Sequence, residues 1–369
     1  MDHLIKKLFR KPSAVIAACI IGLTCLVAIF AYQLSPDSSP YANRMIVELG
    51  ARQPGFRKQL LYIPKAIPPA KENRLTAWFT GMPSAFQYLP INSYWFREDK
   101  ILVSHYIDED MSDTITYKLS ALVPSSIQQQ SIAAQQTYLQ QYQIKKIRFW
   151  LGTDRYGRDI LSRLLVGSRV SIAVGFVAVI LSITIGIILG SLAGYFRGII
   201  DNAIMWVINM LWAIPTLLLV FAITLTIGKG FWEIFIAIGL TMWVSAARLI
   251  RGQIMVLREM EYVTAAKALG LSDIRIIFRH ILPNISGPVM VIAASNFATA
   301  ILIEAGLSFL GIGVQPPQPS WGLMIKEHYN FLLTDRPFLA IIPGIAIMLL
   351  VYAFNILGNA MRDVLDVRE

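Results

Sequence analysis

The sequence predicts an all-α polytopic membrane protein with a small α/β insertion between its first and second membrane helices. Of its 369 residues, 55% are hydrophobic and only 15% are charged, whereas soluble domains usually have about 25% charged residues. Six segments hold the roughly 20 mostly apolar residues that a helix needs to cross a bilayer. They are residues 13–34, 170–195, 203–227, 231–249, 285–306 and 338–358. The long polar stretch between the first two segments predicts the insertion.

The first apolar segment follows a basic N-terminus, which is typical of a signal peptide or of a membrane anchor. The basic residues are Lys6, Lys7, Arg10 and Lys11. The segment is longer than the about 7–15 apolar residues of a signal peptide, and no clear small-residue cleavage site ends it. We therefore expect a retained anchor, with residues 1–34 forming a cytoplasmic tail and the first membrane helix. Both cysteines, Cys19 and Cys25, lie in this segment and cannot form a disulfide framework.

Residues 35–165 form the predicted insertion and the segment before the second membrane helix. This stretch is too long to be a plain loop. Aromatic and β-branched residues predict strands over 94–107 and 114–119, and the Gln-rich stretch 124–142 is compatible with helix. We expect a small α/β module outside the cytoplasm. It either contacts a partner or is a solvated insertion, and the sequence leaves both interpretations open.

Residues 166–360 hold the other five membrane segments. In the second segment glycines repeat at a four-residue spacing, which permits close helix approach and favours ordinary packing. These glycines are Gly186, Gly190 and Gly194. In the third segment Pro215 frees a backbone carbonyl and predicts a kink. The fourth segment gives the weakest signal, because Trp232 and Glu233 stand at its start.

The distribution of basic residues predicts that both termini lie in the cytoplasm. The net charge is +10, and cytoplasmic loops of membrane proteins carry an excess of Lys and Arg. With the N-terminus inside, the short outer loops hold only Lys229, Lys326 and Arg336, whereas the inner loops and tails hold 13 basic residues. The long segment 35–169 is left out of this comparison, because long translocated domains do not follow the rule. Residues 361–369 then form a cytoplasmic tail. This charge fits contact with anionic lipid rather than with nucleic acid.

The polar loop 250–284 between the fourth and fifth membrane segments has a distinct pattern. Ala265 and Ala266 present almost no side chain, so a partner's backbone could approach closely. Gly270 suits a helix C′ position with positive φ, and Ser272 can cap the next helix. We expect a short helix, a sharp turn and a second helix, with Pro283 leading into the fifth segment. The alternative is an amphipathic helix on the membrane surface, which the second half supports through Ile274, Ile277, Phe278 and Ile281.

This loop resembles the coupling loop of ABC-importer permeases. The family pattern is Glu-Ala-Ala, three residues, Gly, nine residues, then Ile-x-Leu-Pro. Two positions depart from it, with Thr264 in place of the Glu and His280 in place of the Ile. The Thr264 departure removes a carboxylate and any ion pair that relatives make with it. The resemblance assigns ATPase coupling to Glu261, Thr264, Ala265, Ala266, Gly270, Leu282 and Pro283.

Three further stretches resemble the C-type subunit of dipeptide, oligopeptide and nickel permeases. They are residues 151–172, 304–322 and 355–366. Residues 35–150 depart from that family, whose members usually have a shorter insert. The resemblance implies a type I ABC-importer fold with six membrane helices.

The first of these stretches reads as a turn that leads into an amphipathic helix. Its charged residues can pair at short helical spacings, and Arg163 and Arg169 are expected at the outer interface, for anchoring or for contact with cargo. The motif residues are Asp154, Gly157, Arg158, Asp159 and Arg163.

Candidates for the translocation path are Glu304, Ser308 and Pro215. An intramembrane carboxylate is a functional candidate by default, but Glu304 lies near the predicted outer end, so a solvated position is an equal alternative. The prolines Pro316, Pro317 and Pro319 exclude a regular helix in the following external loop. Trp321 would suit the membrane interface.

No motif of a nucleotide-binding or metal enzyme is present in the sequence. The stretch 228–230 lacks the Gly and Ser/Thr of a P-loop, and 311–313 lacks the third Gly of a dinucleotide fingerprint. The four histidines are scattered, without zinc-ligand spacing. We therefore expect a transport subunit with no cofactor or metal of its own. The resemblance implies ATP and Mg on two cytoplasmic ATPase subunits, a second related permease and an extracytoplasmic solute-binding protein.

The predicted function is a permease subunit of an ATP-driven, binding-protein-dependent importer in the bacterial inner membrane. The resemblance implies di- or oligopeptides as the cargo. The permease would translocate them by alternating access, coupled to the separate ATPase subunits. The alternatives are the same machinery importing nickel or another small solute, or a membrane scaffold without transport.

Overall fold

The computed structural model describes residues 7–8, 10–69, 73–109, 111–228 and 230–365. The chain divides into two compact units. The membrane unit comprises Met1–Ile29, Gly167–Tyr329 and Ala340–Glu369, and the insertion unit comprises Phe30–Val166 and Asn330–Leu339. Two long helices, α8 (Ile160–Phe196) and α16 (Phe338–Leu365), have most of their residues in the membrane unit.

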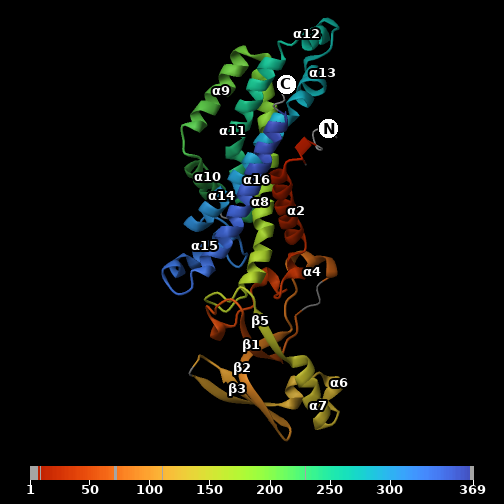
Figure 1. Cartoon of the computed structure of the whole chain (residues 1–369), viewed down its shortest axis with the longest axis vertical. Helices are drawn as coiled ribbons and strands as arrows, with labels where there is room; N and C mark the ends of the chain where they lie inside the picture. The colour runs from red at the N-terminus through yellow and green to blue at the C-terminus, as the bar shows by residue number, and fades with distance from the viewer. Residues whose placement is uncertain (1–6, 9, 70–72, 110, 229, 366–369) are drawn as a thin grey trace. The chain divides into compact units, whose positions relative to one another are not determined.

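Long apolar helices build the membrane unit (Figure 1). Among the described residues, five helical segments are long and apolar enough to cross a membrane, or six if one bent pair counts as a span. They include α2 (Pro12–Ile29), α8, α11 (Phe231–Leu257), α14 (Ser286–Leu310) and α16. The shorter helices of this unit are α9 (Gly198–Trp212), α10 (Thr216–Ile227), α12 (Glu261–Ala268), α13 (Asp273–Ile276), η4 (Ile277–Ile281), η5 (Leu282–Ile285) and α15 (Trp321–His328).

The third predicted segment forms two helices with a sharp bend between them. Helices α9 and α10 meet at 94°, and Pro215 stands at the N-cap of α10. A proline lacks the N–H that would continue the preceding helix. The kink predicted at Pro215 is therefore confirmed, and it is close to a right angle. The fourth segment, which has the weakest sequence signal, forms the long and largely buried helix α11.

The three glycines of α8 face α11. A Cβ added at Gly190 would lie 2.6 Å from the Ala247 carbonyl oxygen, and one added at Gly194 would lie 2.7 Å from that of Arg251. Such contacts are too short for any side chain, so the glycines let the two backbones approach closely. The packing interpretation of this repeat is confirmed.

The insertion unit contains a five-stranded antiparallel sheet in the order β4-β3-β2-β1-β5. The strands are β1 (Phe56–Pro64), β2 (Phe86–Arg97), β3 (Lys100–Tyr106), β4 (Ser112–Lys118) and β5 (Ile144–Phe149). The short helices are α3 (Ala31–Leu34), η1 (Pro40–Ala42), η2 (Val47–Leu49), α4 (Arg74–Thr80), α5 (Leu119–Leu122), α6 (Ser125–Gln128), α7 (Ile132–Tyr138) and η3 (Leu139–Gln143), and η6 (Tyr329–Leu333) has most of its residues in this unit.

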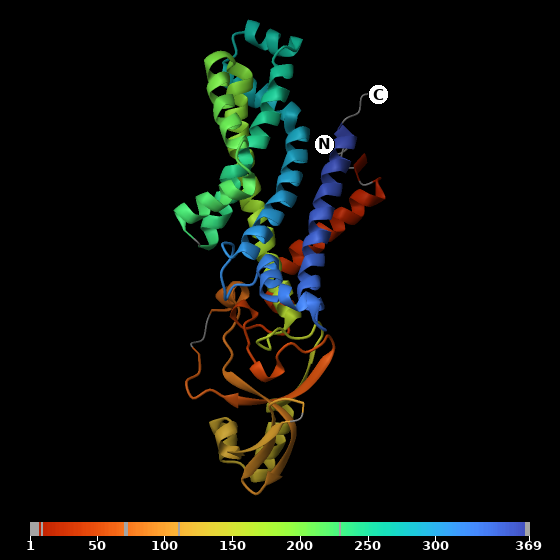
Figure 2. The same ribbon diagram turned by 90° about the vertical axis from the view of Figure 1, so that its left-hand side faces the viewer.

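Both faces of the sheet are covered. Leu61 packs with residues of α5 and η3 on one face, while its neighbour Leu60 packs with Ile46 and Leu49 on the other. Successive strand residues point to opposite faces, so Leu60 and Leu61 are buried in two different hydrophobic cores, one on each face of the sheet. Figures 1 and 2 show α6 and α7 beside the strands.

The insertion is rich in sheet, as expected, but its strand boundaries differ from the prediction. The stretch 94–107 is not one strand, because Arg97 pairs with Lys100 across a tight turn in which Glu98 has φ of +54°. The strand over 114–119 corresponds to β4, and the Gln-rich stretch forms α6, α7 and η3. Strands β1 and β5 were not predicted.

Candidate functional site

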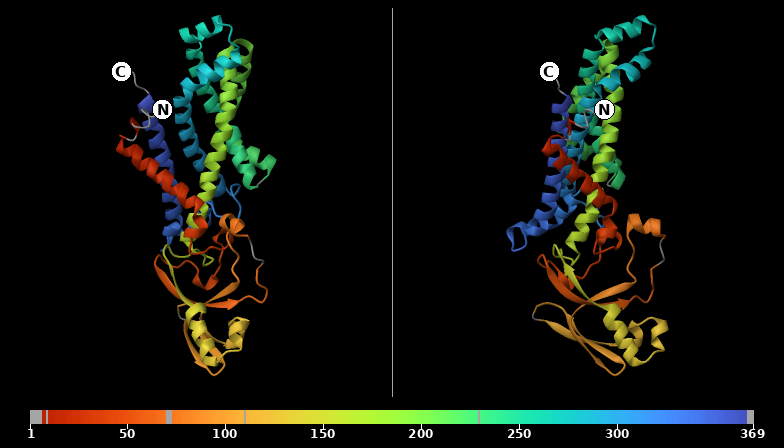
Figure 3. Two further views of the ribbon diagram at one scale, coloured as in Figure 1. Left: turned by 90° about the vertical axis from the view of Figure 1, so that its right-hand side faces the viewer. Right: turned by 45° about the vertical axis from the view of Figure 1, so that its right-hand side comes forward.

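Residues 250–257 of the predicted loop extend α11, and the rest of the loop folds into a short helix, a turn and a second helix, as predicted. Helix α12 lies at one end of the membrane unit, beyond the helical bundle, and α13 follows it (Figures 1 and 3). The chain then continues through η4 and η5 into α14. Pro283 occupies the first turn of η5, where its missing N–H costs no hydrogen bond.

Gly270 ends α12 in the way that the sequence predicts. Its φ is +75°. The Leu271 N–H donates to the Ala266 carbonyl at 3.2 Å, and the Gly270 N–H donates to that of Lys267 at 2.9 Å. This pair of hydrogen bonds is the Schellman motif, which requires a left-handed residue at C′. An added Cβ would meet nothing within 4 Å, so backbone conformation, and not space, selects glycine here.

The two alanines of the loop have different environments. Ala265 is exposed, whereas Ala266 is 5% exposed and packs with Val263, Ile250 and Ile254 beneath the loop. The prediction that both alanines face a partner is therefore wrong for Ala266. Helix α12 turns one face inward, and Ala266 lies on it. Glu261 and Thr264 are exposed beside Ala265.

Large apolar side chains are exposed on the outer side of the loop. Leu269 is 81% exposed, Ile274 68% and Phe278 65%. Ile277 and Ile281 are buried in the core beneath the loop. The apolar residues of the second half thus divide between two faces, and they do not form the single lipid-facing stripe of a surface helix. We call Leu269, Ile274 and Phe278 the apolar rim.

Polar contacts fix the loop to the ends of α8 and α11. The Tyr195 hydroxyl donates to Asp273 Oδ1 at 2.6 Å, and Lys267 Nζ lies 4.9 Å from the centre of the Tyr195 ring. Arg197 pairs with Glu259 at 2.8 Å. The sequence did not predict a role for these residues. An isolated acidic residue in a basic loop, such as Asp273, is the signal that could have found them. Ser272 occupies the N-cap position of α13, but its side chain accepts no capping hydrogen bond.

The motif before α8 is a turn built around Asp154 in the insertion unit. Asp154 Oδ1 accepts hydrogen bonds from the N–H groups of Tyr156 and Arg158 at 2.9 and 3.0 Å, and Asp154 Oδ2 pairs with Arg158 Nε. Gly157 has φ of +71°, and an added Cβ would lie 1.7 Å from the Ile46 carbonyl oxygen. No other residue fits at Gly157.

One expectation for this motif is met in part and another is wrong. The expected pairing of Asp154 with Arg158 at a four-residue spacing is present, but it lies in a turn and not along a helix, because α8 begins only at Ile160. Asp159 accepts the Ser162 N–H at 2.8 Å as a cap. Burial raises the pKa of the Asp159 carboxyl, against the opposing effect of its hydrogen bonds to Ser162. Arg163 is fully buried, 3.9 Å from Asp154, and does not lie at an interface.

Glu304 and Ser308 lie together in the interior of the membrane unit. Both are buried, and the Ser308 hydroxyl donates to Glu304 Oε1 at 2.7 Å. Ser308 Oγ in turn accepts the Val314 N–H at 3.2 Å. The solvated alternative for Glu304 is therefore wrong. Pro215, the third candidate of the translocation path, is exposed at the break between α9 and α10.

The stretch that follows α14 matches one expectation and contradicts another. Residues 311–320, which include the three prolines, contain no regular helix. Trp321 is only 4% exposed, and its ring lies 3.2 Å from a Cβ added at Gly167. The expectation of a Trp at the membrane interface is wrong, because this ring packs inside the unit.

Comparisons with known proteins agree on one family. Residues 186–368 match the family described as binding-protein-dependent transport system inner membrane component. A glutathione transport system permease protein of Pectobacterium atrosepticum is 42% identical over 217 residues, which are 59% of this chain and 72% of that protein. An oligopeptide transport system permease protein of Bacillus subtilis is 41% identical, over 59% of this chain and 71% of its own length.

A third relative and a solved structure were also found. A dipeptide transport system permease protein of Alkalihalophilus pseudofirmus is 42% identical, over 59% of this chain and 71% of its own length. The inward-facing MetNI methionine ABC transporter matches 55% of this chain and 96% of its own chain, with 18% identity and a TM-score of 0.45.

Proposed function

The chain belongs to the family of ABC-importer permeases, and on this premise we propose that it forms part of the path by which short peptides enter a bacterial cell. Permeases of this family have no ATPase site, so hydrolysis takes place on partner subunits. We propose that two cytoplasmic ATPases, which carry ATP and Mg, a second related permease and a solute-binding protein complete the machine.

The exposed loop around α12 is the observation that carries this proposal. Thr264 and Ala265 are exposed and have small side chains, and the residues of the apolar rim follow them closely in sequence. Exposed apolar side chains at the polar end of a helical bundle are typical of a protein interface. We therefore place the ATPase on this face, with both chain termini on the same side of the membrane and the insertion on the other.

Motion of this loop would be passed to the membrane helices through packed side chains. Val263 and Ala266 share one buried cluster with Ile250 and Ile254 of α11 and with Ile285, which precedes α14. The hydrogen bond between Tyr195 and Asp273 adds α8. Closure of the ATPases would shift α12 and carry these helices between inward-open and outward-open states. ATP binding drives this step only if the ATPase contacts the loop differently in the two states.

The cargo proposed here is inferred from the names of the relatives and not from a feature of the membrane unit. The three relatives above transport glutathione, oligopeptides and dipeptides, as their names state. These cargoes are all short peptides. We therefore propose a di- or oligopeptide as the substrate of this chain.

Replacement of Gly270 by Val should abolish peptide uptake while the protein remains in the membrane. A β-branched residue at φ of +75° is strained by about 1–2 kcal/mol or more, so the turn after α12 would refold and displace the docking face. The measurement is uptake of a labelled dipeptide in cells that lack their own copy, with the membrane level checked by immunoblot.

Gly252→Val is the matched control. Gly252 also has open space around an added Cβ, but its φ is not positive, so this variant should transport normally. Normal uptake by Gly270→Val would contradict the docking proposal. Failure of the ATPase subunit to co-purify with Gly270→Val, but not with Gly252→Val, would support it further.

A further inference from the structure

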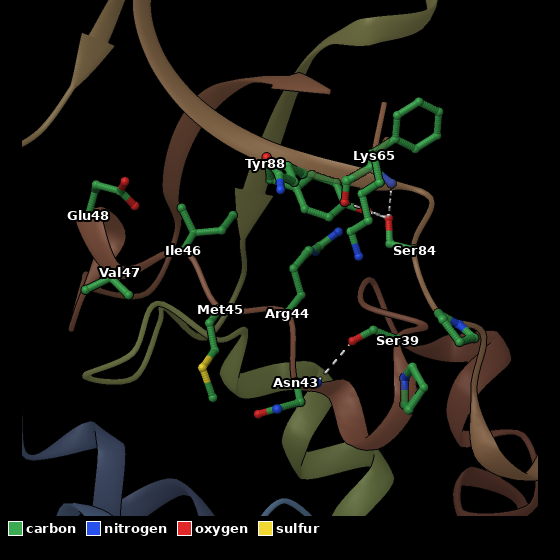
Figure 4. A pocket seen from close by; sticks show the side chains of 14 residues that line it. Ser39, Asn43, Arg44, Met45, Ile46, Val47, Glu48, Lys65, Ser84 and Tyr88 are labelled. Atoms are coloured by element: carbon green, nitrogen blue, oxygen red, sulfur yellow. Dashed lines mark hydrogen bonds between the residues drawn. The ribbon is translucent and has the colours of Figure 1, made fainter. Parts of the chain in front are cut away.

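A cavity of about 650 Å³ opens in the insertion unit. The loop that contains Arg44 and Ile46 forms one wall, and Lys65, Ser84 and Tyr88 come from the opposite side (Figure 4). The family match begins at residue 186, so every lining residue lies outside it. The cavity therefore belongs to the insertion alone.

Arg44 is held at this cavity by the loop around it. Asp37 is 2% exposed, and its two carboxylate oxygens accept the N–H groups of Ser39 and Arg44 at 3.0 Å each. The Arg44 guanidinium lies 4.8 Å from the centre of the Tyr88 ring. Tyr88 is itself fixed, because its hydroxyl is 2.6 Å from Ser84 Oγ. The position of the Arg44 side chain is thus set from both sides.

The charge of Arg44 is only partly compensated. Asp37 is its one ion-pair partner among the described residues, and Arg44 Nε lies 4.0 Å from Oδ1, which already accepts a backbone N–H. A guanidinium has five N–H donors, and Asp37 and Tyr88 engage only part of them. The Arg44 side chain is 11% exposed, and a largely buried cation with unused donors is stabilised by a further acceptor.

Lys65 adds a second cation to the same space. Figure 4 shows the Lys65 amine and the Arg44 guanidinium pointing into the same space, beside Tyr88 and Ser84. Lys65 is exposed, and within the part of the chain that the structure describes no carboxylate forms an ion pair with it. Two cations that converge on one space favour an anion there.

The rest of the cavity is lined by apolar and uncharged polar residues, with one acidic residue away from the cations. Ile46, Val47 and Phe86 are apolar lining residues, and Ser39, Asn43 and Gln87 add polar groups. Glu48 lies on the other side of the view from Lys65 (Figure 4), where its Oε1 is 3.5 Å from His105 Nε2. The cavity therefore combines a cationic end with an apolar wall, and a ligand must satisfy both.

We propose that this cavity binds a small molecule with a free carboxylate next to an apolar side chain, with the carboxylate on Arg44 and Lys65. A short peptide with an apolar C-terminal residue has this chemistry. That choice of ligand rests on the proposed import of peptides, whereas the assignment of a carboxylate site rests on the cavity alone. Ligand pockets commonly have this composition, apolar walls with a few placed charges.

Calorimetric titration of the purified full-length chain in lipid nanodiscs tests the proposal. The probes are the dipeptide Gly-Phe, the same dipeptide with a C-terminal amide, and inorganic phosphate. Gly-Phe should bind, and the amide should bind at least about tenfold more weakly, because hydrogen bonds to a charged group contribute about 1.5–3 kcal/mol. Phosphate should not displace Gly-Phe at equal concentration, since it has nothing to place on the apolar wall.

Variants assign the carboxylate to its two cations. Arg44→Gln should weaken Gly-Phe binding by about tenfold or more. Lys65→Gln should weaken it by about three- to fivefold, because Lys65 is exposed and its ion pair is screened. Lys146→Gln is the matched control, since Lys146 is an exposed lysine of β5 outside the cavity, and it should bind as the original chain does. If Arg44→Gln lowers the yield of folded protein, Lys65→Gln carries the test.

Several results would overturn the proposal. These are equal binding of acid and amide, binding unchanged in both cation variants, displacement by phosphate, or no binding of Gly-Phe. The titration uses neither ATPase nor transport, so its failure leaves the import proposal standing. Conversely, a chain that binds Gly-Phe but supports no uptake would leave the cavity assignment intact.

Discussion

Single residues in this chain are constrained more by backbone geometry than by chemistry. Gly157 and Gly270 both have positive φ, but their surroundings differ, since the space around Gly270 is open and Gly157 lies directly against the Ile46 carbonyl. A glycine is therefore required for two distinct reasons. The sequence predicted the positive φ of Gly270 from its place after a helix. The contact at Gly157 joins residues more than a hundred positions apart, and no local pattern reveals it.

Gly157→Ala should destabilise the insertion unit more than Gly55→Ala does. Both residues have positive φ, which costs an alanine about 1–2 kcal/mol, but an added Cβ at Gly55 meets only the end of Arg148 at 3.9 Å. At Gly157 the backbone of Ile46 must also move. Thermal unfolding of the two purified variants gives the comparison. Equal shifts in the two midpoints would show that the contact with Ile46 relaxes without cost.

Tyr62 should make the stability of the insertion unit sensitive to alkaline pH. Burial raises the pKa of Tyr62, and the charge of Arg44 only partly opposes this effect. The folded state thus keeps the phenolic proton to higher pH than the unfolded chain does. The contribution to the free energy of unfolding is fully present below the unfolded pKa of about 10 and is lost as pH rises through the folded pKa.

Tyr62→Phe should accordingly flatten the fall in the unfolding midpoint above about pH 10. Tyr142→Phe is the control, because Tyr142 is 57% exposed and should leave the profile unchanged. Identical profiles for the two variants would argue against a buried phenol at Tyr62.

Among the structural elements, the membrane helices were the easiest to predict and the strands the hardest. A run of about 20 apolar residues has few alternatives, and all six predicted segments are helical in the structure. For the third, the sequence predicted a bend at Pro215, but hydropathy does not predict that the bend reaches 94°. Strand β5 escaped because Lys145 and Lys146 interrupt its apolar residues. The motif before α8 was found, but the burial of Arg163 depends on tertiary packing that its sequence spacing does not encode.

Gly190→Leu should prevent stable packing of α8 on α11. The new side chain would start within 2.6 Å of the Ala247 carbonyl oxygen, so the helices must separate and lose the close contact between their backbones. We expect a large fall in the unfolding midpoint or loss of the protein from the membrane. Gly22→Leu in α2 is the comparison, because an added Cβ at Gly22 meets nothing within 4 Å. A stable Gly190→Leu protein would contradict the close approach of α8 and α11.

At the scale of the whole molecule, most of the insertion lies between two neighbouring strand ends. Phe56 at the start of β1 pairs directly with Phe149 at the end of β5. The chain therefore leaves and returns at almost one point, and the family match lies wholly after it. The sequence identified this segment as extra, because its relatives have a shorter insert, but gave no sign that its ends adjoin.

Replacement of residues 57–148 by an Asn-Gly turn should leave the membrane unit folded. The turn suits two antiparallel strand ends, and the buried cluster around Phe235 and Ile238 contains no residue of the insertion. We expect the shortened chain to reach the membrane and to co-purify with its ATPase, while binding of Gly-Phe is lost. Failure to reach the membrane would show that the insertion is needed for folding.

The apolar rim has a consequence for how the cell must make this protein. In the proposed orientation, a newly made copy without its ATPase exposes Leu269, Ile274 and Phe278 to the cytosol. Chaperones and proteases recognise exposed apolar side chains of this kind in subunits that lack their partners. Synthesis of the chain should therefore have to keep pace with that of its ATPase, because any surplus would be degraded.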